Sequence, residues 1–169
     1  MAERISLRDY QRGLAERLRA ADAGRTASKL AVQAGAESWL VDLTEAGEVI
    51  PVPMITAVAQ TRPWFKGVAN VRGNLYSVVD FPAFLGGRGV SLSEQSRLLL
   101  IAPRYRAGAA LLIDSSLGLR NPESWQPREA AQAPAVWQRA EYEDEAGKVW
   151  KELDVAELVR DQNFLTVGN

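Results

Sequence analysis

The chain has 169 residues, of which 47% are hydrophobic and 24% charged, a balance that suits one folded domain or two small lobes and excludes an intrinsically disordered protein. Its 20 basic and 21 acidic residues give a net charge of −1, which argues against a protein that binds nucleic-acid backbones. Cysteine and histidine are both missing, which excludes disulfides, cysteine nucleophiles, imidazole bases, a phosphoacceptor histidine and zinc sites built from these residues.

The N-terminal segment has the pattern of an amphipathic helix over residues 6–21, followed by a linker rich in small and polar residues that ends at residue 28. The apolar positions that recur at helical spacing are Leu7, Tyr10, Leu14 and Leu18. Arginines in this segment alternate with acidic residues, which indicates a solvated helix face rather than a nucleic-acid-binding arm. We therefore expect residues 1–28 to be a helix and linker outside the main domain.

From residue 29 onward the pattern changes to short strands separated by turns. The expected strands cover residues 30–32, 39–43, 49–50, 55–60, 67–72, 75–80, 97–102, 109–113, 136–142 and 149–150. The dipeptide Gly73-Asn74 supplies the positive φ angles that a tight hairpin needs. Short strands with frequent turns predict an all-β barrel or sandwich with small helices.

Two short helices are expected at aspartates that follow strands. Asp80 can cap a helix with Pro82 in its first turn, which the glycines at 86 and 87 would end. Asp154 can cap a second helix, with Glu157 completing a capping box.

Three aspartates are the main candidates for chemistry. Asp42, Asp80 and Asp114 each close an apolar run, so they could meet as a carboxylate cluster for acid–base or metal work. The alternative, that each caps the following helix or turn, is favoured. The glycine-rich residues 85–89 lack the Lys-Ser/Thr pair of a phosphate-binding loop, and the serines at 115 and 116 have no histidine partner. We predict no catalytic site, metal site or cofactor.

Two residues near the hairpin are candidates for other roles. Arg72 can pin the turn by bonding backbone carbonyls, or project outward to a carboxylate, and the sequence leaves both readings open. Most of the five tryptophans are expected in the core, although an exposed Trp64 would suit a partner-binding anchor.

The segment from Glu48 to Asp80 resembles the signature of CheW-like chemotaxis coupling proteins. It has an acidic residue before an apolar pair, a proline–aromatic turn, then Gly-Val-Ala-Asn-Val-Arg-Gly at residues 67–73 and a strand ending in aspartate. Weaker matches extend the resemblance over roughly residues 29–160, leaving 161–169 as a C-terminal tail. The detail around Trp64 is most similar to the pilus-linked, PilI-like branch, which serves twitching motility. Family members usually have one more residue between the turn proline and the glycine, and often a proline where Ser77 stands.

The resemblance implies two five-stranded SH3-like barrel lobes around a shared apolar core. It implies a non-enzymatic adaptor that couples the cytoplasmic tip of a methyl-accepting receptor to the regulatory domain of a histidine kinase. The positions that match the family's coupling signature are Glu48, Gly67, Asn70, Arg72 and Gly73.

The alternatives are a β-barrel that binds nucleic acid and an enzyme domain that uses aspartates and a metal. The first is disfavoured by the balanced charge, and the second by the capping role expected of the aspartates. No apolar run approaches the roughly 18 residues of a membrane span, and no secretory signal is visible. We therefore expect a cytoplasmic protein without direct membrane insertion.

Overall fold

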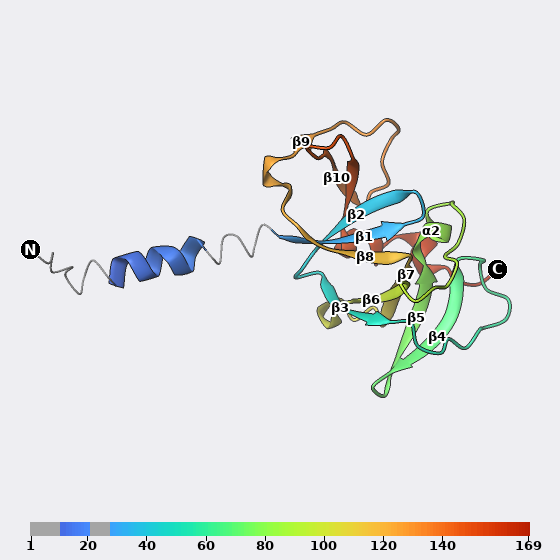
Figure 1. The fold of residues 1–169 in the computed structure, drawn as a ribbon. Coiled ribbons are helices and arrows are strands. Elements are labelled where there is room, and N and C mark those ends of the chain that lie inside the picture. The colour runs from blue at the N-terminus through green and yellow to red at the C-terminus, as the bar shows by residue number, and fades with distance from the viewer. Residues whose placement is uncertain (1–10, 21–27) are drawn as a thin grey trace, which may run out of the picture.

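The structure is a computed structural model that describes residues 11–20 and 28–169 (Figure 1). Residues 11–20 form a helix, which confirms the central part of the predicted N-terminal helix. Its two leucines, Leu14 and Leu18, are exposed. The rest of that prediction, residues 6–10 and 21 with most of the linker, lies outside the described residues.

The remaining chain forms two antiparallel-rich sheets, each with one parallel strand pair. The six-stranded sheet, here lobe 1, has the order β8-β1-β2-β11-β10-β9, and the five-stranded sheet, lobe 2, has the order β3-β6-β7-β5-β4. The strands are β1 (Lys29–Ala34), β2 (Glu37–Asp42), β3 (Ala46–Pro51), β4 (Phe65–Val71), β5 (Asn74–Asp80), β6 (Arg97–Ile101), β7 (Ala109–Ile113), β8 (Ser115–Arg120), β9 (Gln126–Pro127), β10 (Gln138–Glu143) and β11 (Val149–Leu153).

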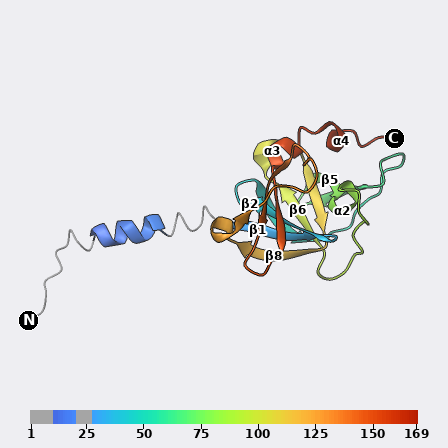
Figure 2. The same cartoon turned by 90° about the horizontal axis from the view of Figure 1, so that it is seen from above.

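Short helices decorate the sheets. They are α2 (Phe81–Phe84), η1 (Pro103–Tyr105), η2 (Pro122–Ser124), α3 (Val155–Leu158) and α4 (Gln162–Leu165). Figure 2 shows α3 and α4 on the same side of the molecule. Asp80 and Asp154 cap α2 and α3 through their side chains, as predicted.

The chain crosses between the lobes twice. It begins in lobe 1 with β1 and β2, builds lobe 2 with β3 to β7, and returns to lobe 1 with β8 to β11. The predicted two-lobed all-β fold is confirmed, with six strands rather than five in lobe 1. Among the described residues no strand ladder joins the two ends of either sheet, so neither barrel is closed by strand pairing.

The core follows from the period of two along the central strands. Leu99 and Leu111 belong to an apolar cluster shared by both lobes, while Leu98 and Leu112 belong to a cluster inside lobe 2. Because alternate residues of a strand face opposite sides of the sheet, β6 and β7 are buried on both faces and read as continuous apolar runs. A smaller cluster inside lobe 1 centres on Trp150.

One strand prediction was wrong, and strand β8 was missed. Residues 55–60 form no strand, and within them Thr56 makes only an isolated bridge with Val68. The prolines at 51 and 53 precede this stretch and cannot donate backbone hydrogen bonds, which disfavours continued sheet pairing. Conversely, β8 was not predicted, because its residues are largely exposed and Gly118 interrupts the alternation with a φ of 77°.

The tryptophans pack against other rings. Trp39 and Trp150 are buried, whereas Trp125 and Trp137 are half-buried beside them. Trp64 is also half-buried and meets Phe84 edge-on at 5.1 Å, so it is not the fully exposed anchor considered from the sequence.

In the part of the chain that the structure describes, no helix is both long enough and apolar enough to cross a membrane.

Candidate functional site

The tip of the β4–β5 hairpin carries three of the five signature residues. Arg72 and Gly73 have φ angles of 52° and 85°, so these two residues, and not Gly73-Asn74, form the turn. Positive φ at both central positions is the requirement of a tight hairpin turn, and a non-glycine residue there is strained. The side chain of Asn70 accepts a hydrogen bond from the Gly73 amide at 2.9 Å, which stabilises the turn.

The guanidinium of Arg72 binds the carboxylate of Glu48 in a two-bond fork. The distances are 2.8 Å from Nη1 to Oε2 and 2.6 Å from Nη2 to Oε1. These hydrogen bonds hold the pKa of Glu48 below its usual value and raise that of Arg72. Of the two readings left open by the sequence, the structure therefore favours contact with a carboxylate.

This ion pair joins the two ends of the lobe 2 sheet. Glu48 lies on β3, the first strand of the order, and Arg72 follows β4, the last. The contact shows that the sheet curls until its ends approach each other. The side chains remain 45% and 68% exposed, so the pair is presented at the surface of the molecule.

Gly67 has a different role from the other signature residues. Its φ is 129°, and a Cβ atom there would lie 2.0 Å from the carbonyl oxygen of Thr56. Val68, which follows Gly67, pairs with Thr56 through two backbone hydrogen bonds of 2.8 and 2.9 Å. Gly67 is therefore required where the 52–64 segment crosses the edge of β4, and it has no side chain to offer a partner.

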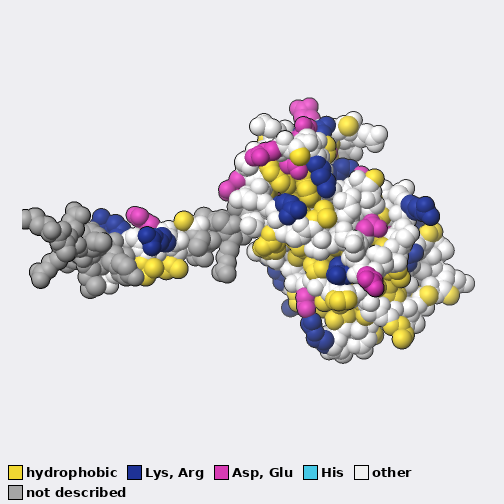
Figure 3. Space-filling model, in the orientation of Figure 1, with side chains coloured by type: hydrophobic (Ala, Val, Ile, Leu, Met, Phe, Trp, Pro, Cys, Tyr) yellow, Lys and Arg dark blue, Asp and Glu magenta, His cyan; other side chains and the backbone are white. Residues whose placement is uncertain are grey.

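A cleft of about 230 Å³ opens beside the ion pair. Its lining includes the charged residues Glu48 and Arg72, the aromatic residue Tyr76, and the apolar residues Leu100 and Pro103. The cleft thus combines charged groups with aromatic and apolar surface. Figure 3 shows basic, acidic and apolar side chains interspersed over the face drawn, rather than gathered by charge.

The three candidate aspartates serve separate local structures. Asp80 is fully buried and accepts hydrogen bonds from the amides of Ala83 and Val90 at 3.1 and 3.0 Å. Asp42 accepts from Thr44, and Asp114 accepts from the amide of Gly35 at 2.6 Å. The structure therefore supports the capping reading for Asp42 and Asp80, whereas Asp114 bonds the distant turn between β1 and β2 rather than a turn that follows it. Within residues 11–20 and 28–169, no group of three such side chains is placed to hold a metal ion.

Comparison with known proteins places this architecture in a family. The family model for the CheW-like domain matches residues 29–163. PilI of Pseudomonas aeruginosa is 32% identical, with 72% of this chain and 75% of PilI covered. The chain belongs to the CheW-like family.

Two further relatives agree with this assignment. The chemotaxis protein CheW of Klebsiella aerogenes is 24% identical, over 80% of this chain and 82% of its own length. The crystal structure of the scaffolding protein TtCheW from Thermoanaerobacter tengcongensis superposes with a TM-score of 0.61 at 17% identity, covering 76% of this chain and 88% of TtCheW. The predicted membership of the CheW-like family and the predicted similarity to PilI are confirmed, and the last comparison bears on the fold alone.

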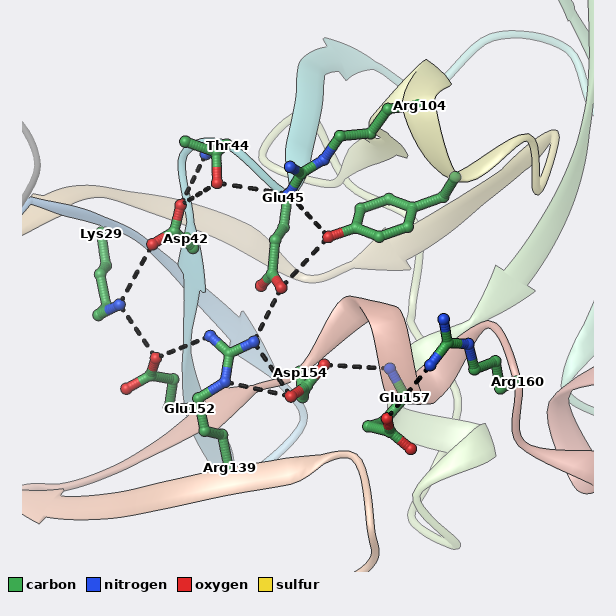
Figure 4. A network of polar contacts seen from close by, with 11 residues as sticks. Lys29, Asp42, Thr44, Glu45, Arg104, Arg139, Glu152, Asp154, Glu157 and Arg160 are labelled. Atoms are coloured by element: carbon green, nitrogen blue, oxygen red, sulfur yellow. Dashed lines mark hydrogen bonds and ion pairs between the residues drawn. The ribbon is translucent and has the colours of Figure 1, made fainter.

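The CheW-like chain also contains a polar network that the sequence analysis missed (Figure 4). Arg139 contacts three carboxylates, those of Glu45 at 2.8 Å, Glu152 at 3.3 Å and Asp154 at 3.1 Å. Burial lowers the pKa of Arg139, but hydrogen bonds and charge from Glu45 and then Asp154 raise it well above its usual value. Glu45 and Arg139 are 94 residues apart in sequence, so no local pattern could have paired them.

Proposed function

We propose that this chain is a non-enzymatic scaffold that couples a methyl-accepting receptor to a histidine kinase in a chemosensory pathway controlling type IV pilus twitching motility. Membership of the CheW-like family and the similarity to PilI support this proposal. The observation that carries it to particular residues is the exposed Glu48–Arg72 ion pair at the hairpin tip.

The proposed kinase contact is on lobe 2. Glu48, Asn70 and Arg72 have exposed side chains there, whereas Gly67 and Gly73 act through the backbone conformations that they permit. A bidentate guanidinium at a surface can exchange an intramolecular carboxylate for one on a partner without losing its geometry. The edge strand β3, which carries Glu48, is suited to pair edge-on with the similar barrel of the kinase regulatory domain.

The proposed receptor contact is an apolar cleft. It has a volume of about 350 Å³ and lies between lobe 2 residues such as Phe65, Val79 and Ala109 and C-terminal residues such as Val159 and Leu165. An amphipathic helix binds by laying its apolar face into such a groove. Each contact would be modest in area, so assembly would depend on several weak contacts acting together.

The test is titration calorimetry against the regulatory domain of a pilus chemosensory kinase. The native chain is expected to bind, and Arg72→Glu is expected to lose binding while its circular dichroism and melting temperature show a folded protein. An exposed ion pair that solvent screens contributes little to stability, so loss of binding would not reflect unfolding.

A charge swap separates a partner contact from an internal one. The double variant Glu48→Arg with Arg72→Glu can restore the internal ion pair with reversed polarity. If Arg72 contacts the kinase, the swapped protein stays defective. Recovery of full binding by the swap would show that only the internal pair matters, and binding by Arg72→Glu itself would refute the proposed site.

A further inference from the structure

The crossover between the lobes is held at Glu45. This residue lies between β2 of lobe 1 and β3 of lobe 2. Its amide donates to the carbonyl of Asp42 at 3.0 Å, and its carbonyl accepts from the amide of Ala102 at 3.1 Å. The backbone of Glu45 is therefore bonded to the end of each lobe.

The side chain of Glu45 also reaches both lobes. Its Oε1 atom accepts from Nη2 of Arg139 at 2.8 Å and from the hydroxyl of Tyr105 at 3.3 Å. Arg139 lies on β10 of lobe 1, whereas Tyr105 ends η1, which follows β6 of lobe 2. Figure 4 shows the carboxylate of Glu45 directed toward Arg139.

The other strand-borne ion pairs of this network stay within lobe 1. Glu152 of β11 contacts Arg139 and also Lys29, at 3.0 Å, and Lys29 contacts Asp42 at 3.5 Å. Arg139 would therefore keep two carboxylate partners, Glu152 and Asp154, if Glu45 were removed. The Glu45–Arg139 pair is the member of the network that links the lobes.

Stability alone is a poor explanation for this glutamate. Glu45 is 5% exposed, and its Oε2 atom has no hydrogen-bond partner among the described residues. A buried carboxylate that is only partly satisfied is commonly no more stabilising than an apolar side chain of similar size. What an apolar side chain cannot supply is direction, because hydrophobic burial is non-directional whereas a charge-assisted hydrogen bond fixes distance and angle.

The link between the lobes is close to the proposed partner site. Glu48 stands three residues after Glu45 and is the third residue of β3, which begins at Ala46. The pairing of β3 with β6 is irregular there, since the register shifts between Ala46 and Val49. Sheet pairing thus defines this end of β3 weakly, and the contacts of Glu45 define it instead.

We propose that Glu45 is a positioning residue: its ion pair with Arg139, here called the interlobe latch, sets the angle between the lobes and through β3 the orientation of Glu48 and Arg72. The effect on the lobes is independent of what the chain binds. The effect on binding rests on the function proposed above.

The angle can be measured directly because the native chain has no cysteine. Spin labels on Ser116→Cys in β8 and Leu75→Cys in β5, both exposed, report the distance between the lobes by double electron–electron resonance. Glu45→Ala is expected to shift or broaden the distance distribution relative to the native background. Glu45→Gln keeps the shape of the side chain without its charge, so its distance distribution is expected to lie between those of Glu45→Ala and the native background. It replaces Glu45→Ala as the test variant if Glu45→Ala does not fold.

The matched control removes a buried carboxylate that shares Arg139 with Glu45 but whose own partners all lie in lobe 1. Glu152→Gln meets this condition, because its partners Lys29, Arg139 and Tyr142 all belong to lobe 1. Glu152→Gln is expected to lower the melting temperature but to leave the distance distribution unchanged. If Glu152→Gln does not fold, Asp42→Asn is used as the control instead. An unchanged distribution in both Glu45 variants, or equal broadening in the control, would overturn the latch.

Binding is measured on unlabelled protein against the same kinase regulatory domain. Glu45→Ala is expected to weaken binding roughly tenfold, within the range for residues coupled through a shared backbone shift. The control is expected to bind as the native chain does. Broadened distances with native affinity would refute the positioning of the partner site. Absence of binding by the native chain would refute the proposed function. The distances between the spin labels would still test whether Glu45 sets the angle between the lobes.

Discussion

Replacing Gly67 with alanine tests whether the signature glycine is needed for folding rather than for contact. At φ 129° an added Cβ would lie 2.0 Å from the Thr56 carbonyl oxygen and 2.9 Å from the Cα of Ala57. Both neighbours are backbone atoms, so they cannot move aside by changing a rotamer. The segment that crosses β4 must therefore separate from the strand.

The size of the effect follows from what this separation breaks. The two backbone hydrogen bonds between Thr56 and Val68, 2.8 and 2.9 Å long, would be lost or stretched, at about 1 kcal/mol each. The unfavourable φ of a non-glycine residue adds about 1–2 kcal/mol. The free energy of unfolding should thus fall by about 3–4 kcal/mol, which for a domain of this size lowers the melting temperature by about 10 °C.

The assay is thermal and urea denaturation followed by circular dichroism, with Gly73→Ala as the matched control. Gly73 also has a positive φ, 85°, but among the described residues no heavy atom lies within 4 Å of a Cβ added there. Gly73→Ala therefore introduces conformational strain without a steric clash and should lower the free energy of unfolding by only about 1–2 kcal/mol. Equal destabilisation of the two variants would refute the steric argument for Gly67.

Three further perturbations have defined outcomes. Phe164→Ala should lower the free energy of unfolding by about 3–5 kcal/mol, because this side chain is only 6% exposed. The neighbouring side chain of Leu165 is 58% exposed, so Leu165→Ala should lower it by less than about 1 kcal/mol. Urea denaturation of the two variants measures this difference. Asp80→Ala removes the acceptor of two backbone amides at 3.0 and 3.1 Å, so hydrogen exchange at both should accelerate, and unchanged exchange would contradict the cap. Hydrogen bonds led by that from Trp150 lower the pKa of Asp144 below its usual 3.8. Its stabilising contribution should therefore be complete above that pH and disappear as the pH falls through the lower folded-state value, so Asp144→Asn should show a smaller loss of melting temperature on acidification than the native chain.

Local chemistry made much of the fold predictable. The aspartate caps of α2 and α3 need only residues within one helical turn, and the apolar runs of β6 and β7 directly reflect burial on both faces. The hairpin was located correctly, but its turn was placed one residue late. The Gly-Asn dipeptide appeared to be the turn, whereas Arg72 occupies the positive-φ position that would ordinarily favour asparagine or glycine.

Long-range contacts account for what the sequence did not reveal. The partner of Arg72 is 24 residues away, and the open choice between a carbonyl and a carboxylate was resolved only when the curled sheet brought Glu48 beside it. Arg139 lies in a strand of ordinary polar pattern, so nothing local marks it as the partner of a buried glutamate. Edge strand β8 is largely exposed and contains a bulge, so it lacks the alternation of apolar and polar residues that indicates a half-buried strand.

The ion pair of Glu48 on β3 and that of Glu45 just before β3 have one mechanical consequence together. β6 is the strand partner of β3 in the described sheets, so the other side of this edge strand is positioned by side chains: Glu48 reaches Arg72, and Glu45 reaches Arg139. A displacement of β3 that changes one contact is expected to alter the other, because Glu45 and Glu48 are only three residues apart. A partner that competes for Arg72 would thus loosen Glu48 and, along the same strand, strain the contact between the lobes. Energetic coupling between the two pairs is therefore expected even though neither touches the other.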